Sequence, residues 1–210
     1  MLISVSFLKN KTNNKLTIDE IDNSLANMIH VDIMDGKFVS NKTITNEEAK
    51  DLFASRKKDL DIHLMVEHPL EYINELKVLK PKYITFHIES LDNIDRVIDE
   101  LKKENIGVGI ALNPETRIYN IIPYLKRLDL ILVMSVNPGK GGQEFIKSSY
   151  SKVNELKAMQ KKYNYLISVD GGINDTTIKD LKSDIVCVGS YITMSDNFDE
   201  KITILKDILT

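Results

Sequence analysis

The stretch IHVDIMDG at residues 29–36 is an apolar run that ends in polar residues. In a strand, successive side chains point to opposite faces, so His30, Asp32 and Met34 share one face of this run. An imidazole and a carboxylate on one face, near the end of a buried strand, indicate a functional site built on a rigid element.

Two later runs repeat this pattern of a strand that ends in polar residues. LDIHLM at residues 60–65 contains His63, and LISVDGG at residues 166–172 brings Asp170 to the strand end, just before a glycine pair. Histidines and carboxylates near the C-terminal ends of several strands suggest a metal or catalytic centre.

Short β-rich runs alternate with segments of helical period along the whole chain. The predicted strands span residues 2–8, 29–34, 60–65, 82–88, 106–112, 128–136, 165–170 and 184–189. The predicted helices span residues 17–27, 45–56, 70–79, 91–104, 117–128, 148–162, 176–182 and 199–209. Side-chain oxygens at Thr45 and at residues 175–177 are expected to cap two of these helices.

Strands that alternate with helices predict a parallel sheet covered by helices. Eight such units in 210 residues favour a single-domain α/β fold, a closed (β/α)₈ or TIM barrel over residues 1–210. An open doubly wound sheet is the competing fold, and its dinucleotide-binding version needs a G-x-G-x-x-G loop after the first strand. That loop here, KNKTNNK at residues 9–15, contains no glycine, so we favour the barrel.

Composition narrows the class of protein. The net charge is only −3, and no basic face is interleaved with aromatic residues, so we expect no nucleic-acid partner. The single cysteine, Cys187, lies in an apolar run, which fits a reducing compartment better than a nucleophile. No apolar stretch approaches the ~20 residues of a membrane span, and the first residues lack the pattern of a signal peptide. We therefore expect a cytoplasmic protein that has no membrane partner.

Polar residues occur at equivalent ends of the predicted strands. Ser6, His30, Asp32, His63 and Asp170 lie late in their strands, where barrel enzymes carry their function. Two neutral imidazoles and two carboxylates are suitable ligands for one divalent cation such as Zn, Fe, Mn or Co. The alternative is that each is a separate polar residue satisfied in the core or in a loop.

Glycines cluster late in the chain, after the last three predicted strands. They occur in VNPGKGGQ at residues 136–143, in DGGIN at residues 170–174 and in GS at residues 189–190. Glycine lets backbone N–H groups approach an anion, and loops after the last strands of a barrel often hold a phosphate. We therefore expect a phosphorylated ligand. Lys140 either adds charge to that site or is solvated.

A cation centre and a phosphate anchor together suit a sugar phosphate with a carbonyl near the metal. The metal would polarise the carbonyl and stabilise an enediolate. Asp32 and Asp170 come from strands well apart in the barrel and could face each other across that planar intermediate, so that together they invert one carbon. Met34, Met65 and Met134 either line the site and exclude water or fill the core.

Six motifs give nearly the whole chain a resemblance to the ribulose-phosphate 3-epimerase family. They are IHVDIMDG (29–36), LDIHLMV (60–66), ITFHIE (84–89), ALNP (111–114), MSVNPGKGGQ (134–143) and VDGGIN (169–174). The resemblance implies a (β/α)₈ barrel that converts D-ribulose 5-phosphate to D-xylulose 5-phosphate with a bound divalent metal.

The resemblance also implies roles for individual residues. By motif position, His30, Asp32, His63 and Asp170 look like the metal ligands, and Asp32 and Asp170 look like the acid/base pair. Ser6 and His63 resemble substrate contacts. The positions that resemble the phosphate loops of the family are Gly139, Gly141, Gly142, Gly171, Gly172, Gly189 and Ser190.

The chain departs from the family pattern in its loops. Val5 and Ser40 stand where the family usually has proline, Lys9-Asn10-Lys11 replaces a Ser-Ala-Asp stretch, and Lys140 replaces an aromatic residue. These departures leave a 3-epimerase of a hexulose 6-phosphate, such as D-allulose 6-phosphate, as an alternative. A non-catalytic sugar-phosphate-binding protein is the second alternative.

A few remaining polar residues are assigned to supporting roles. His87 is interpreted as a core histidine, with support of the site as the alternative, and His68 as a loop residue. Asp35 and Asn113 are expected to serve turns or to lie behind the site. Family members of this type are often dimers or hexamers, and the sequence leaves a homo-oligomer open.

Overall fold

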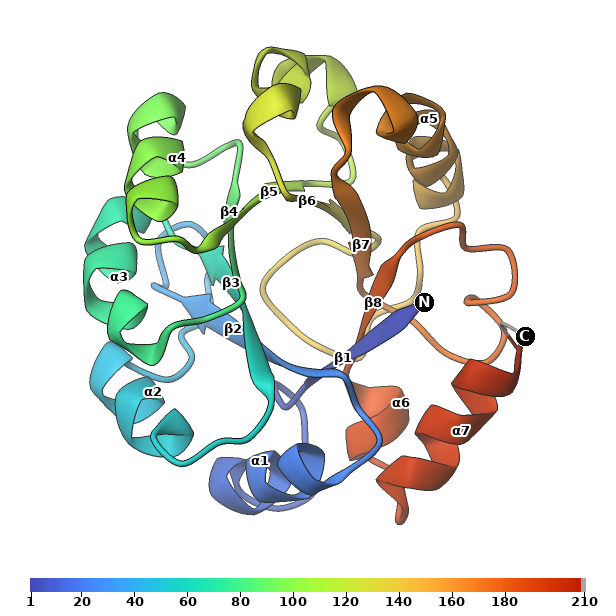
Figure 1. Cartoon of the computed structure of the whole chain (residues 1–210). Helices are drawn as coiled ribbons and strands as arrows, with labels where there is room; N and C mark the ends of the chain where they lie inside the picture. The colour runs from blue at the N-terminus through green and yellow to red at the C-terminus, as the bar shows by residue number, and fades with distance from the viewer. Residues whose placement is uncertain (209–210) are drawn as a thin grey trace.

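Eight parallel strands follow one another around a closed barrel in the order of the chain (Figure 1). The computed structural model describes residues 1–208. All eight predicted strands are present, and their ends differ from the predicted ends by at most two residues. The prediction of a (β/α)₈ barrel is therefore confirmed.

The strands are β1 (Leu2–Ser6), β2 (Met28–Met34), β3 (Asp59–Met65), β4 (Tyr83–His87), β5 (Gly107–Leu112), β6 (Leu130–Met134), β7 (Leu166–Asp170) and β8 (Ile185–Val188). The α-helices are α1 (Asn14–Asn23), α2 (Asn46–Phe53), α3 (Pro69–Leu76), α4 (Ile94–Lys103), α5 (Ser149–Tyr163), α6 (Ser190–Thr193) and α7 (Phe198–Ile208). Two 3₁₀ helices, η1 (Lys77–Leu79) and η2 (Ile118–Arg127), complete the described elements.

Local signals explain where most helices begin. Thr45 caps α2 in a reciprocal capping box with Glu48, as the sequence predicted. α1 begins three residues earlier than predicted because the side chain of Asn13 accepts a hydrogen bond from the N–H of Leu16. The predicted helix over 199–209 corresponds to α7, and residue 209 lies outside the described residues.

Two segments predicted as α-helices have a different secondary structure. The segment 176–182 forms turns instead of a helix. The Asn174 side chain accepts the N–H groups of Thr176 and Thr177 in the manner of a helix cap, but the backbone bond from the Leu181 N–H to the Ile178 carbonyl then closes a turn, and no helix continues. The segment predicted as a helix over 117–128 is the 3₁₀ helix η2, which contains Pro123. The short α6 was not predicted.

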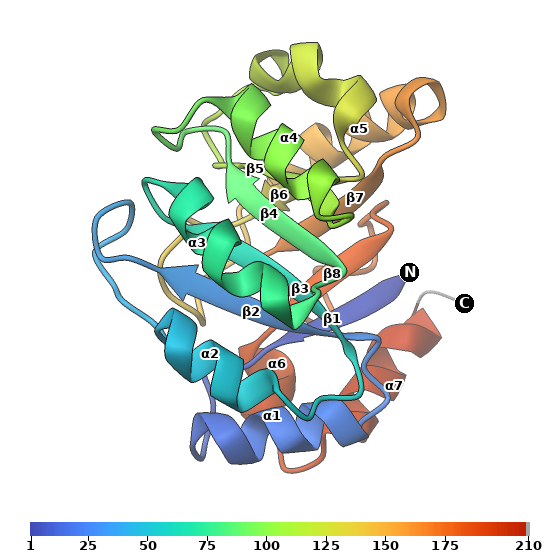
Figure 2. The ribbon, with the colours of Figure 1, turned by 60° about the vertical axis from the view of Figure 1, so that its left-hand side comes forward.

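The helices pack on the outside of the barrel, as Figures 1 and 2 show for α1 to α4. Outward residues of the strands, such as Val31 and Ile33, join helix residues such as Ile21 and Phe53 in one large apolar core. No helix within residues 1–208 is long and apolar enough to cross a membrane.

The strand register brings the polar residues of the sequence motifs side by side. Asp32 on β2 pairs with His63 on β3, and Met134 on β6 pairs with Asp170 on β7. Paired residues of parallel strands point to the same face, so these side chains all turn into the barrel. The opposite, N-terminal end of the barrel is closed by Met28, Leu130 and Ile185, which form a separate apolar cluster.

The barrel interior leaves no room for a side chain at Gly109 on β5, which lies beside Thr85 on β4. A Cβ atom on Gly109 would lie 2.1 Å from Thr85 Oγ1 and 3.0 Å from Thr85 Cα. We expect Gly109→Ala to lower the free energy of unfolding by about 1–3 kcal/mol through overpacking. Urea titration measures this loss. Combining it with Thr85→Ala should restore part of the stability, and strictly additive effects of the two substitutions would contradict the steric explanation.

Candidate active site and metal centre

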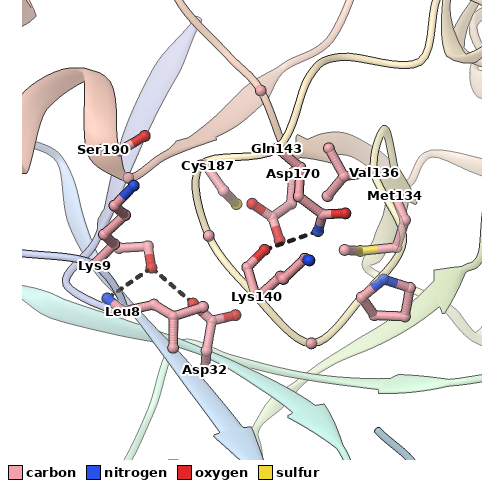
Figure 3. Close-up of a pocket in the computed structure, with 18 of the residues that line it drawn as sticks. Leu8, Lys9, Asp32, Met134, Val136, Lys140, Gln143, Asp170, Cys187 and Ser190 are labelled. Carbon is pink, nitrogen blue, oxygen red and sulfur yellow. Dashed lines mark hydrogen bonds between the residues drawn. The ribbon is translucent and has the colours of Figure 1, made fainter. Parts of the chain in front are cut away.

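A pocket opens at the C-terminal ends of the barrel strands (Figure 3). Its walls bring together Ser6, Asp32 and Asp170 with all three glycine segments. The methionines at positions 34, 65 and 134 also line it, which favours the lining role over plain core filling. Asp32 and Asp170 reach this pocket from different sides, because β2 and β7 are not neighbours in the barrel.

The residues His30, Asp32, His63 and Asp170 form one compact cluster. Each offers one possible ligand atom, and these four atoms lie within 4.8 Å of one another. Both histidines are fully buried, and the Asp170 side chain is 18% exposed. The four residues that the sequence predicted as ligands are therefore close enough to hold one cation.

Asp32 lies at the centre of this cluster. Ser6 Oγ donates to its Oδ2 at 2.7 Å, and His63 Nδ1 lies 3.2 Å from its Oδ1. Burial opposes ionisation of this carboxyl, but the neighbouring imidazoles of His30 and His63 hold its pKa well below the usual range. Asp32 is therefore ionised at neutral pH.

Asp170 has the opposite electrostatic environment. Burial, together with the negative charge of Asp32, raises the pKa of Asp170 to about 7 in the metal-free protein. His63 Nδ1 lies 3.8 Å from Asp170 Oδ2, so one imidazole nitrogen faces both carboxylates. The site thus pairs an ionised carboxylate with one that is partly protonated near neutral pH.

The hydrogen bonding of the two His30 ring nitrogens indicates whether the cluster can hold a cation. Its Nδ1 lies 2.8 Å from Asp61 Oδ2, and its Nε2 is buried with no hydrogen-bond partner, although Asp32 Oδ1 is 3.4 Å away. A buried polar nitrogen without a partner is unfavourable, and a bound cation would satisfy it. The residues present therefore fit a divalent cation held by nitrogen and oxygen ligands.

Asp61 was missed by the sequence analysis. It is 1% exposed, accepts a hydrogen bond from Ser4 Oγ at 3.0 Å and orients the His30 ring. It precedes His63 by two residues in β3, so the strand alternation that singled out His63 applies equally to it. Cys187 Sγ lies 3.3 Å from His30 Nδ1, so the cysteine packs behind the same ring.

His87 contacts the cluster directly, which corrects its interpretation as a plain core histidine. Its Nε2 lies 2.8 Å from His63 Nε2, and its Nδ1 lies 3.2 Å from Glu89 Oε2. Glu89 also accepts hydrogen bonds from the Asn113 N–H, at 3.1 Å, and from Thr116 Oγ1. Asn113 therefore lies behind the site, as expected, and the chain of contacts runs from His63 to the loop after β5.

Asp35 and His68 serve the loops, as the sequence predicted. The Asp35 carboxylate accepts the backbone N–H groups of Lys37, Phe38 and Glu67, which fixes the loops after β2 and β3. The His68 imidazole is partly exposed and lies 3.1 Å from an oxygen of Asp92.

We expect His87→Ala to weaken binding of a divalent cation about 10–100-fold while the barrel stays folded. The partner of a metal-ligating histidine fixes its tautomer and orientation, and losses of this size are typical when it is removed. Titration of the metal-free protein with Zn²⁺ or Mn²⁺ measures the affinity. His68→Ala removes an imidazole outside the cluster and serves as the control. Equal affinities for His87→Ala and the unmodified protein would show that His87 only fills space.

The pKa of Asp170 leads to a prediction about the metal-free protein. A carboxyl with a folded-state pKa of about 7, against a usual value of 3.8, binds a proton that the unfolded chain releases. This contribution to stability is present at low pH and is lost as pH rises toward 7. We therefore expect Asp170→Asn to raise the melting temperature of the chelated protein more at pH 8 than at pH 5. Asp99→Asn, on α4 outside the pocket, is the control; its carboxylate pairs with Arg127.

The glycine segments form the other side of the pocket. The predicted phosphate positions that line it are Gly139, Gly141, Gly142, Gly171, Gly172, Gly189 and Ser190. Gly172 has a φ of +64°, and a Cβ there would lie 2.6 Å from the backbone nitrogen of Phe145. Only glycine allows this close approach of the loops after β6 and β7.

Comparison with known proteins agrees with this geometry. A family model described as the ribulose-phosphate 3 epimerase family matches residues 2–193. A ribulose-phosphate 3-epimerase of Helicobacter pylori is 38% identical over 192 residues, which cover 89% of this chain and 87% of the relative. The enzyme of that name from Bacillus subtilis is 37% identical over 163 residues, covering 76% and 75% of the two chains.

Solved structures share the fold at low sequence identity. KGPDC from Streptococcus mutans aligns with a TM-score of 0.70 at 13% identity, covering 99% of this chain and 96% of the other. The 3-hexulose-6-phosphate synthase of Salmonella typhimurium aligns with a TM-score of 0.68 at 18% identity, covering 100% and 98%. These likenesses support the barrel fold alone.

Proposed function

The chain belongs to the ribulose-phosphate 3-epimerase family and is an epimerase, and we propose that it interconverts D-ribulose 5-phosphate and D-xylulose 5-phosphate by moving a proton at C3. The observation that carries this proposal is the pair Asp32 and Asp170. The two carboxylates come from strands well apart in the barrel, face one imidazole nitrogen and have pKa values pushed in opposite directions. Such divergence is typical of an acid/base pair.

In this mechanism the ionised carboxylate removes the proton from C3 on one face of the sugar. The electron pair of the C–H bond moves into the C2–C3 bond, and the carbonyl oxygen at C2 takes up the negative charge of a planar enediolate. The other carboxyl, protonated at the start, returns a proton to C3 from the opposite face, which inverts that carbon. The roles of Asp32 and Asp170 exchange when the reaction runs in the other direction.

The remaining residues of the pocket bind and orient the sugar. We assign His30, Asp32, His63 and Asp170 as the ligands of one divalent cation, which when bound supplies positive charge that stabilises the enediolate. The donor set accepts Zn, Fe, Mn or Co. Ser6 donates to Asp32 and so fixes the orientation of that carboxylate. The glycine segments offer backbone N–H groups to the phosphate, and the three methionines limit access of water.

Turnover of D-ribulose 5-phosphate by the purified protein tests this proposal, before and after chelation and with single metals restored. D-Allulose 6-phosphate is run beside it, because the loops at Lys9, Ser40 and Lys140 depart from the family pattern. We expect fast formation of D-xylulose 5-phosphate that chelation abolishes. Activity on the hexulose alone would keep the mechanism and change the substrate, and activity on neither sugar would favour a sugar-phosphate-binding protein.

We expect Asp32→Asn and Asp170→Asn each to lower kcat by several orders of magnitude while the fold survives. An amide has nearly the shape of the carboxyl group but cannot take up or return the C3 proton. Metal content is measured on each variant, so that loss of the cation is distinguished from loss of proton transfer. Asp99→Asn is the control. Near-normal turnover of either site variant with metal bound would exclude the two-carboxylate mechanism.

A further inference from the structure

Lys9 lies along the wall of the pocket, in the loop between β1 and α1. A Cβ on Gly141 would lie 3.3 Å from Lys9 Cβ, and a Cβ on Gly142 would lie 2.8 Å from Lys9 Nζ. The side chain therefore runs beside the glycine loop that follows β6. Figure 3 shows its amino group on the side of the pocket where Ser190 begins α6.

The backbone around Lys9 is fixed, whereas its ammonium has no partner among the residues that the structure describes. Ser6 Oγ accepts the N–H of Leu8 at 3.2 Å, and the carbonyl of Lys9 accepts a hydrogen bond from Thr193 Oγ1. Within residues 1–208, Lys9 Nζ makes neither an ion pair nor a hydrogen bond. Lys11, two residues further along the loop, pairs with Asp196 at 2.6 Å.

We propose that the Lys9 ammonium binds the phosphate group of the substrate and sets the preference of this enzyme for phosphorylated over unphosphorylated sugars. The proposal rests on the proposed function. The backbone N–H groups of the glycine segments carry no full positive charge, and Lys9 adds such a charge to the wall beside Ser190. A lysine ammonium is a compact charge with three donors, and its contact with a phosphate dianion is a charge-assisted hydrogen bond.

Gly142 is the residue that makes room for this contact. Its φ is +75°, and any side chain there would occupy the space of the Lys9 ammonium. Lys140 lines the same pocket, but it lies on the loop between Gly139 and Gly141, away from Ser190 in Figure 3. Of these two lysines, only Lys9 lies between the glycine loop that follows β6 and the start of α6.

The test compares Lys9→Gln with the unmodified enzyme on D-ribulose 5-phosphate and on D-ribulose. The contact is a hydrogen bond between charged groups, so we expect its loss to raise KM for the phosphorylated sugar about 10–100-fold. We expect kcat to stay within about twofold, since the contact is made equally in the ground state and the transition state. Activity on D-ribulose should not change, and Lys9→Arg should recover part of the loss.

Lys11→Gln removes the same charge from the same loop and is the matched control. Inorganic phosphate, titrated by calorimetry into the metal-loaded protein, adds a readout independent of turnover and should bind Lys9→Gln more weakly. Equal losses on both sugars would reveal a structural role, and equal losses in Lys9→Gln and Lys11→Gln would reveal only long-range charge. Either result, or unchanged KM and phosphate affinity, overturns the proposal. An unmodified enzyme without epimerase activity overturns the proposed function instead, and phosphate titration still tests Lys9.

Discussion

The constraint on which this site depends is the burial of negative charge inside the barrel. Asp32 and Asp61 are buried, Asp170 is largely buried, and the ion-pair partners of all three within residues 1–208 are histidines. Carboxylates held away from water are costly unless they are paired. Burial opposes the charged form of His30, yet the surrounding carboxylates of Asp32 and Asp61 raise its pKa well above the usual value. An interior this rich in negative charge is suited to a divalent cation. The large apolar core outside the strands stabilises the fold and so offsets the cost of burying these charges.

Much of the fold and the four-residue cluster followed from the sequence because both depend on local periodicity. Strand alternation places His30 and Asp32 on one face, and the alternation of strands with helices predicts closure of the barrel. The predictions that failed depended on contacts between elements or on how far a capped turn continues as a helix. The role of His87 depends on the distance between β3 and β4, which no single strand pattern encodes. The segment 176–182 has helical periodicity and a capping residue, Asn174, but its backbone closes a turn between Leu181 and Ile178 instead of continuing as a helix.

The residues of the four-residue cluster lie on strands, whereas most departures from the family pattern lie in loops. The groups assigned to proton transfer and cation binding lie on β2, β3 and β7, where hydrogen bonds to neighbouring strands fix the backbone. The departures from the family pattern lie mostly in loops, at Lys9, Ser40 and Lys140. A change in a loop can therefore alter which sugar is bound without disturbing the carboxylates. This separation explains how the four-residue cluster can keep the family pattern while the pocket wall carries an unusual lysine.

The two buried histidines of the candidate metal centre offer opposite ring nitrogens to the cluster, and their neighbours decide which nitrogen each offers. His30 Nδ1 faces Asp61, which leaves Nε2 for the cluster, whereas His63 faces the carboxylates with Nδ1 and His87 with Nε2. If His63 Nδ1 is to offer its lone pair, its proton must sit on Nε2 and be donated to His87 Nε2. The proton of His87 then sits on Nδ1, where Glu89 accepts it. Glu89 in turn is held by the loop after β5, so a carboxylate outside the pocket sets the tautomers of both His87 and His63. The HIE sequence at residues 87–89 therefore belongs to the candidate metal centre, although Glu89 does not line the pocket.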